Sequence, residues 1–215
     1  MDAVIQDLRE NYEKATLEIT GVAAHPVEQF KTWLQLALNA KIKEPNAMTL
    51  ATVDADGYPS ARIVLLKGVR EEGFIFYTNY ESQKGQELQS NPHAALVFNW
   101  LDLEKQIRIK GLVEKMAATD SAAYFQSRPK GSQIGAWASP QSQVIKDRSI
   151  LEQNVEQLHN QYKDQEKLPC PSHWGGYLVR PTEIEFWQGR SSRLHDRIRY
   201  RLEADQSWTI ERLAP

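Results

Sequence analysis

Cysteine, net charge and long apolar runs are all scarce in this chain of 215 residues. Its single cysteine, Cys170, excludes an internal disulfide and a paired-cysteine metal site, so we expect no metal and a reducing, cytoplasmic environment. The 26 basic and 28 acidic side chains nearly balance, which gives no reason to expect nucleic acid or an anionic membrane as partner. No run reaches the roughly 18 apolar residues of a membrane span, and residues 1–10 lack the apolar core of a signal peptide.

Four common enzyme motifs are also missing. The chain has no G-x-G-x-x-G after a strand, no G-x-x-x-x-G-K-[ST], no H-E-x-x-H and no G-x-S-x-G. These absences argue against a Rossmann dehydrogenase, a P-loop NTPase, a zincin and an α/β-hydrolase. Any phosphate that the protein binds must therefore be held by side chains.

Hydrophobic periodicity predicts a mainly β (α+β) protein. Helical spacing indicates helices over 27–40, over a segment after the N-cap Ser82, over 119–126, and over 144–163, the last packing on the sheet. Alternation indicates strands over 48–53, 61–69, 74–79, 94–100, 106–115, 183–188, 195–202 and 208–212. Seven or eight such strands favour an antiparallel β-barrel with flanking helices. Too few residues follow the break at 169–176 to fold alone, so we expect one domain over 1–215, with 1–25 as a mobile N-terminal segment.

The most basic stretch lies between residues 190 and 201. Strand alternation puts one set of polar side chains on one face: Arg193, His195, Arg197, Arg199 and Arg201. Leu194, Ile198 and Tyr200 fall on the other face. The stretch is then either a solvated edge strand whose charges discourage aggregation, or a surface that recognises an anionic, planar ligand.

Isolated cations offer further candidate anion ligands. Arg62 and Lys67 end an apolar strand and point to opposite faces if it is regular. Arg128 and Ser132 lie in a Pro/Gly loop with the composition of an oxyanion pocket, and Lys84 begins a short helix. An ordinary exposed side chain is the alternative for each lysine. The aromatic residues Tyr77, Tyr124, Trp137, Trp174 and Trp187 either wall a flat ligand or fill the core.

Several short segments follow one another in a characteristic order. They are Arg62-Ile-Val-Leu-Leu-Lys67, Phe76-Tyr-Thr-Asn79, Gln106-Ile-Arg-Ile-Lys-Gly111, Ser127-Arg-Pro129, Ser132-Gln-Ile-Gly-Ala-Trp137, Trp174-Gly-Gly-Tyr177, Ile184-Glu-Phe-Trp-Gln188 and Arg193-Leu-His-Asp-Arg197. Together they resemble the pyridoxamine 5'-phosphate oxidase family, from about Arg9 to the ending Arg212-Leu-Ala-Pro215. The number and order of these segments make chance similarity implausible.

The resemblance implies a split β-barrel of the FMN-binding type. It implies a homodimer with FMN sites at the subunit interface, each drawing residues from both chains. It also implies oxidation of pyridoxamine 5'-phosphate or pyridoxine 5'-phosphate by O2 to pyridoxal 5'-phosphate, with release of H2O2.

Site residues carry over from the family position by position. The positions that match FMN ligands are Arg62, Ile63, Val64, Leu65, Leu66, Lys67, Tyr77, Thr78, Lys84, Gln106, Gln141, Ser142, Trp187 and Arg197. Those that match substrate ligands are Arg9, Tyr12, Lys67, Tyr124, Arg128, Ser132, Arg193, Leu194 and His195. Among these, Arg193 and His195 are the predicted catalytic pair: Arg193 orients the ring substituents, while His195 orients the substrate or assists proton transfer.

One position departs from the family. Many members have Arg-Lys after the Phe-Tyr-Thr-Asn strand, whereas this chain has Gln83-Lys84, so a charge-assisted contact to the FMN phosphate becomes neutral or is absent. Three other interpretations of the function stay open: a non-catalytic FMN- or pyridoxal-phosphate-binding protein on the same barrel, a flavin reductase that uses a nicotinamide, or a purely structural dimer.

Overall fold

The computed structural model describes residues 10–215, which form two compact units. Unit 1 comprises the described residues up to Leu50 together with Ala95–Gly111 and Pro181–Pro215. Unit 2 comprises Ala51–Ala94 and Leu112–Arg180. Arg9, a predicted substrate ligand, lies outside the described residues, as does the first part of the predicted mobile segment 1–25.

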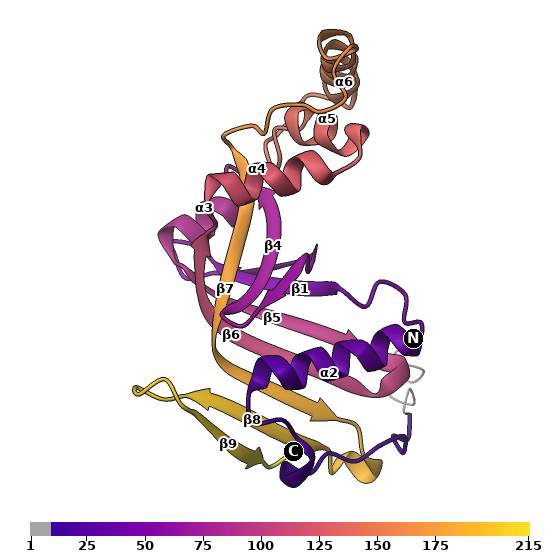
Figure 1. The fold of residues 1–215 in the computed structure, drawn as a ribbon, viewed down its shortest axis with the longest axis vertical. Helices are drawn as coiled ribbons and strands as arrows, with labels where there is room; N and C mark the ends of the chain where they lie inside the picture. Colours follow the sequence, from indigo (N-terminus) through magenta and orange to yellow (C-terminus); the bar gives the residue numbers. More distant parts are fainter. Residues whose placement is uncertain (1–9) are drawn as a thin grey trace. The chain divides into compact units, whose positions relative to one another are not determined.

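Strands dominate the described chain (Figure 1). They are β1 Ala47–Val53, β2 Pro59–Leu65, β3 Gly68–Arg70, β4 Gly73–Asn79, β5 His93–Trp100, β6 Lys105–Lys115, β7 Trp174–Gln188, β8 Asp196–Leu202 and β9 Trp208–Leu213. The helices are α2 Pro26–Asn39, α3 Gln83–Ser90, α4 Ala118–Ser127, α5 Lys130–Ala138 and α6 Ser149–Gln161, with 3-10 turns η1 Ile19–Gly21, η2 Leu101–Leu103 and η3 Ser191–Arg193.

Within residues 10–215 the nine strands form one sheet, ordered β2-β1-β5-β6-β7-β4-β3, with β8 on β7 and β9 on β8. The β3/β4, β4/β7, β7/β8 and β8/β9 pairs are antiparallel. The mainly β, antiparallel architecture with flanking helices is therefore confirmed.

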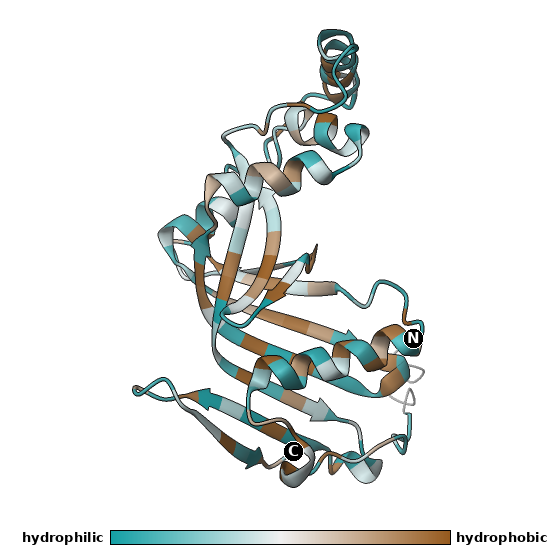
Figure 2. Ribbon diagram, in the orientation of Figure 1, coloured by the Kyte–Doolittle hydropathy of each residue, from teal (hydrophilic) through white to brown (hydrophobic). Residues whose placement is uncertain are grey.

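Unit 1 is organised by α2, which spans nearly the predicted residues 27–40, although Leu38 of its predicted apolar stripe is 50% exposed. Pro26 opens the helix, and His25 Nδ1 accepts a hydrogen bond from the backbone N–H of Val27 at 3.3 Å. The apolar side of α2 is buried: Phe30 meets Phe98 with ring centroids 5.0 Å apart, and Trp33 likewise meets Phe186. Burial of each such side chain stabilises the fold by roughly 1.5–3 kcal/mol. Figure 2 shows apolar and hydrophilic residues alternating along α2.

Unit 2 places a helical cluster beside the ends of β4 and β7. Ser82 caps α3 by accepting from the N–H of Gly85, as predicted. The helices α4, α5 and α6 close around the buried side chains of Phe125, Ile134 and Leu168. These side chains hold in place the residues of α4 and α5 that line the cavity described below.

The helix predicted over 144–163 is shorter in the structure, where it is α6, and it packs on other helices. It begins at Ser149, because Asp147 accepts hydrogen bonds from the backbone and hydroxyl of Ser149 and ends the preceding loop. Val144 is fully exposed. Its apolar residues Val155 and Leu158 pack in the cluster of α4 and α5 rather than on the sheet, so this prediction was wrong.

The predicted strand 61–69 is two strands. β2 ends at Leu65 and β3 starts at Gly68, so Lys67 lies in the link between them, where its N–H donates to the carbonyl of Ile75 at 2.8 Å. Lys67 therefore does not end a regular strand that begins at Arg62, and the argument from odd spacing fails.

The predicted loop around Ser132 is in fact helix α5. Its glycines and the preceding proline suggested a loop, but the apolar residues Ile134 and Ala138 are spaced by four and buried. The predicted break at Gly175 and Gly176 is likewise part of β7. A Cβ at Gly175 would lie 2.1 Å from Tyr80 Oη, so this glycine permits close packing within the strand.

The predicted strand 195–202 begins one residue later. Arg193 has φ of 61° and stands with Leu194 in the turn before β8, where Leu194 is 70% exposed. Leu194 therefore does not share the buried face of Ile198 and Tyr200, although the alternation of those two with the arginines of β8 is confirmed.

Candidate active-site residues in two groups

Unit 2 contains a cavity of about 430 Å³ that gathers many of the predicted ligands. The predicted residues that line it are Leu65, Lys67, Tyr77, Thr78, Tyr124, Arg128, Ser132 and Gln141. They come from β4, α4 and α5, from the end of β2, and from the segments that follow β2, α4 and α5, so residues distant in sequence share one surface. Ile63, by contrast, is 65% exposed and Leu66 is buried in the core.

One wall of this cavity is aromatic. The rings of Tyr77 and Tyr124 stack at 3.9 Å between centroids and 22° between planes. Trp174 lies nearly parallel to Tyr77 at 5.4 Å and 13°. Trp137 is placed differently, since its Nε1 donates to the carbonyl of Pro169 at 2.9 Å. Three of the five predicted aromatic residues thus form one stack.

Arg128 is the cation of this wall. Its guanidinium lies 4.6 Å from the centroid of the Trp174 ring. Within the described residues its Nη1 is buried without a hydrogen-bond partner. Burial lowers the pKa of Arg128, and the nearby Tyr124 acts in the opposite direction. A buried donor of this kind is costly unless an anion accepts from it, which makes Arg128 a candidate oxyanion ligand.

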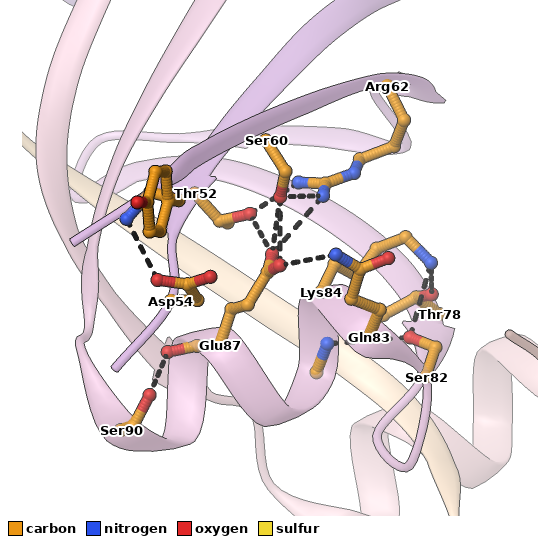
Figure 3. Close-up of polar contacts among 12 residues, drawn as sticks. Thr52, Asp54, Ser60, Arg62, Thr78, Ser82, Gln83, Lys84, Glu87 and Ser90 are labelled. Carbon is orange, nitrogen blue, oxygen red and sulfur yellow. Dashed lines mark hydrogen bonds and ion pairs between the residues drawn. The ribbon is translucent and has the colours of Figure 1, made fainter. Parts of the chain in front are cut away.

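Lys84 is a second buried cation, on the first turn of α3 (Figure 3). Its Nζ donates to Ser82 Oγ at 3.2 Å, and to Thr78 Oγ1 and Gln141 Oε1 at 3.3 Å each. Burial, followed by the positive charge of Arg62, lowers the pKa of Lys84. These neutral acceptors leave a positive charge that a phosphate could balance.

Arg62 stands at the middle of β2 and is held by side chains. It donates to Thr52 Oγ1 through Nη1, and to Ser60 Oγ at 2.5 Å and Glu87 Oε2 at 3.2 Å through Nη2. None of these three acceptors belongs to the predicted site. Nothing local in the sequence distinguishes them, because they come together only when β1, β2 and α3 fold.

Unit 1 gathers the remaining described ligands around His195. Tyr12 and Trp187 both lie beside the imidazole, at centroid distances of 5.9 and 4.5 Å. A cavity of about 440 Å³ is lined by Tyr12, Gln106, Trp187 and His195 among others, and one of about 610 Å³ by Tyr12, Arg193 and His195 among others.

The hydrogen bond that His195 accepts determines which ring nitrogen carries the proton. The backbone N–H of Arg190 donates to His195 Nδ1 at 3.1 Å, so the neutral ring carries its proton on Nε2. Burial, and then the charge of Arg193, lower the pKa of His195. The side chain therefore offers an N–H donor at neutral pH.

The arginines of β8 are paired with glutamates. Arg197 donates to Glu185 Oε1 at 2.8 Å and Oε2 at 3.0 Å. Arg199 donates through Nε and Nη2 to Glu211 Oε2, and Arg201 pairs with Glu203. For Arg199 and Arg201 these ion pairs favour a structural role over an anion site, but β8 lies between β7 and β9, so the prediction of an edge strand was wrong.

The predicted ligands within residues 10–215 thus fall into two groups. Unit 2 holds the predicted ligands numbered 62 to 142, apart from Gln106. One of them, Ser142, has a left-handed backbone with φ of 71°. Unit 1 holds Tyr12, Gln106, Trp187, Arg193, Leu194, His195 and Arg197. Among the same described residues no group of three or more His, Cys, Asp or Glu side chains is placed to hold a metal ion, and no helix has the length and hydrophobicity to cross a membrane.

Comparison with known proteins gives full-length matches. Residues 34–162 match the family model described as pyridoxamine 5'-phosphate oxidase, and residues 174–215 match the pyridoxine 5'-phosphate oxidase C-terminal dimerisation region. A curated protein from Salinibacter ruber, named pyridoxine/pyridoxamine 5'-phosphate oxidase, is 57% identical over 98% of this chain and 99% of its own. One of the same name from Acaryochloris marina is 58% identical over 98% of this chain and 95% of its own.

Solved structures share the fold. The crystal structure of PhzG from Burkholderia lata 383, in complex with tetrahydrophenazine-1-carboxylic acid, has a TM-score of 0.89 and 30% identity, covering 96% of this chain and 100% of that one. A pyridoxamine 5'-phosphate oxidase-related, FMN binding protein from Nostoc punctiforme has a TM-score of 0.68 and 20% identity, covering 90% and 100%. The predicted split-barrel fold is thereby confirmed.

Proposed function

Because the chain belongs to the pyridoxamine 5'-phosphate oxidase family and is an oxidoreductase of that family, we propose that it makes pyridoxal 5'-phosphate. The substrates are pyridoxamine 5'-phosphate and pyridoxine 5'-phosphate, the electron acceptor is O2, and H2O2 is released. The observation that carries the proposal is the buried donor of Arg128, which has no hydrogen-bond partner among residues 10–215 and lies beside an aromatic stack. An anion anchor beside a flat wall suits a phosphorylated pyridine.

FMN is the proposed cofactor, and the donor set of unit 2 fits it. Lys84 donates to hydroxyl and amide oxygens, and Arg62 donates to two hydroxyls and to the carboxylate of Glu87, so two cations are available for a phosphate held by side chains. Gln141 and Thr78, which bond Lys84, also line the cavity of unit 2. When bound, FMN accepts a hydride equivalent from the substrate carbon and passes the two electrons to O2.

The substrate phosphate binds, in this proposal, to the side chains of Lys67, Tyr124, Arg128 and Ser132. They lie remote from the reacting carbon, so their binding energy serves to orient the ring. The aromatic stack forms a flat wall of the cavity on which such a ring can pack.

The proposed catalytic pair acts by donation rather than by taking a proton. His195 Nδ1 already accepts from Arg190, so only Nε2–H remains to contact the substrate. Arg193, in the turn before β8, supplies a fixed positive charge that orients the ring oxygen or amine. An Arg193→Leu variant with undiminished turnover would disprove this role.

A homodimer is supported by the match of residues 174–215 to a dimerisation region. We infer that its FMN sites lie at the subunit interface and that each draws ligands from both chains. The cytoplasm is the proposed location, since the chemistry needs only soluble substrates.

Anaerobic mixing tests the reaction. FMN-loaded protein is mixed with pyridoxamine 5'-phosphate while the absorbance of oxidised flavin is followed, and air is then admitted. Bleaching, recovery of the yellow colour and stoichiometric aldehyde are expected. A spectrum that never bleaches with flavin bound would point to a flavin-binding protein, and consumption of NADH without aldehyde would identify a flavin reductase. Because a similar protein was crystallised with tetrahydrophenazine-1-carboxylic acid, that compound should be tested beside pyridoxamine 5'-phosphate in the same assay.

A further inference from the structure

Glu87 is a buried carboxylate that neither the family resemblance nor the proposed reaction uses. It lies on α3 and is only 5% exposed. An ionised carboxylate this deep is costly unless donors satisfy it, and here they converge from three elements (Figure 3). Thr52 of β1 and Ser60 of β2 donate to it, as does Gln83 from the preceding turn of α3.

The charged partner of Glu87 is Arg62. Arg62 Nη2 donates to Glu87 Oε2 at 3.2 Å. The hydroxyls of Thr52 and Ser60 accept from Arg62 while donating to Glu87, so the guanidinium and the carboxylate are joined both directly and through two bridges. An arginine side chain has many rotamers of similar energy, and this set of contacts selects one.

Gln83 belongs to the same network. Its Nε2 lies 2.8 Å from Glu87 Oε1, so the amide that replaces the more usual arginine of the family is turned to Glu87. A neutral donor at this position leaves Arg62 as the cation paired with Glu87. The departure from the family pattern at residue 83 and the buried carboxylate therefore form one arrangement.

Glu87 also acts between two like charges. The charge of Arg62 lowers the pKa of Lys84, whereas Glu87 raises it. Burial raises the pKa of Glu87 itself, but hydrogen bonds from Thr52, Ser60 and Gln83, together with Arg62, outweigh it and lower that pKa. Glu87 is therefore ionised at neutral pH and offsets the repulsion of two neighbouring cations.

We propose that Glu87 is a positioning residue for the cofactor phosphate: it holds the guanidinium of Arg62 in the orientation that binds the phosphate of FMN. The inference rests on the proposed assignment of Arg62 and Lys84 to that phosphate. For removal of the Glu87 carboxylate it predicts weaker FMN binding, whereas the loss of a negative charge alone would predict tighter binding. Removing a carboxylate near a phosphate should strengthen binding by Coulomb's law, whereas loss of a positioning residue weakens it.

Titration of the apoprotein with flavin, with the quenching of flavin fluorescence as the measure of binding, distinguishes a positioning residue from a simple charge effect. In Glu87→Gln the Kd for FMN should rise about tenfold, whereas the Kd for riboflavin, which lacks the phosphate, should stay within about twofold. At saturating FMN, kcat and KM for pyridoxamine 5'-phosphate should change little. In an Arg62→Met background the effect of Glu87→Gln on FMN binding should vanish.

Glu81→Gln is the matched control, since it removes the same charge from an exposed position on the segment before α3. It should not weaken FMN binding. Unchanged or tighter FMN binding in Glu87→Gln would overturn the proposal, as would equal weakening of both flavins, which indicates a purely structural role. If Glu87→Gln does not fold, Glu87→Asp keeps the charge but shortens the side chain, and the same comparison decides. A wild-type protein that binds FMN and riboflavin equally would instead refute the proposed phosphate site.

Discussion

Arg128→Met should separate the stability of the protein from its use of phosphorylated substrate. Methionine is shorter than arginine and has no donor, but it is unbranched and still packs against an aromatic ring such as that of Trp174. In the wild-type protein Nη1 of Arg128 is buried and, among residues 10–215, has no hydrogen-bond partner. The substitution therefore deletes a buried donor that costs free energy without the substrate, together with the cation–π contact to Trp174.

The magnitude follows from that geometry. Loss of a charge-assisted hydrogen bond to phosphate costs about 1.5–3 kcal/mol, which is a fall of about 10- to 150-fold in kcat/KM. Removal of the buried donor should raise the free energy of unfolding of the substrate-free protein by about 1–3 kcal/mol. Loss of the cation–π contact with Trp174 should lower it by about 0.5–2 kcal/mol. The free energy of unfolding should thus stay within about 1–2 kcal/mol of the wild-type value.

Two assays test this reasoning. Denaturant unfolding of the FMN-loaded protein measures stability, and steady-state kinetics compare pyridoxamine 5'-phosphate with unphosphorylated pyridoxamine. The variant should lose its preference for the phosphorylated substrate and show little change with pyridoxamine. Equal losses on both substrates, or unfolding that becomes easier by several kcal/mol, would refute the role of Arg128 as phosphate ligand.

Three further predictions concern the protonation of His195, the packing of Gly175 and the sharing of sites between subunits. Because burial and Arg193 lower the pKa of His195, kcat/KM should fall only when the pH drops below the usual histidine value of about 6.5, since a proton on Nδ1 breaks the hydrogen bond from Arg190 that orients the ring. His195→Asn should lack this limb of the pH–rate profile, and a limb that persists would rule out His195 as its source. Gly175→Ala should destabilise the protein by roughly 1–3 kcal/mol in denaturant unfolding, because its Cβ would meet Tyr80 Oη at 2.1 Å; an unchanged midpoint would contradict this packing. Co-refolding Arg128→Met with Arg193→Leu should restore up to about 25% of wild-type activity if each site uses both chains, since half the dimers then carry one intact site. Activity no greater than the average of the two variants would show that both residues serve a site from one chain.

Local pattern predicted most of the elements, and long-range packing explains the errors. The apolar stripe of α2 and the capping serine of α3 act over neighbouring residues, so the sequence pattern sufficed. The glycine at position 175 suggested a break because the close approach of Tyr80, 95 positions earlier, has no local signal. Helix α5 was missed because its first residues read as a loop.

The candidate site divides in the same way. Arg128, Lys84 and His195 are chemically distinctive residues inside short motifs, and the resemblance to the family singled them out. Glu87 is a glutamate on an amphipathic helix, and only the fold shows that it is buried against Arg62, 25 positions away. The stacking of Tyr77 on Tyr124 is likewise a property of β4 and α4 together.

The hydroxyl of Ser82 serves two purposes at once. It accepts from the N–H of Gly85 as the cap of α3 and also from Lys84 Nζ at 3.2 Å. An engineer seeking thermostability would try aspartate there, since it is as good a helix cap as serine and adds a favourable charge at the helix start. That carboxylate would also neutralise Lys84 and repel a bound phosphate. Helix stability and the proposed binding of the FMN phosphate by Lys84 therefore depend on the same atom, and selection for one restricts the other.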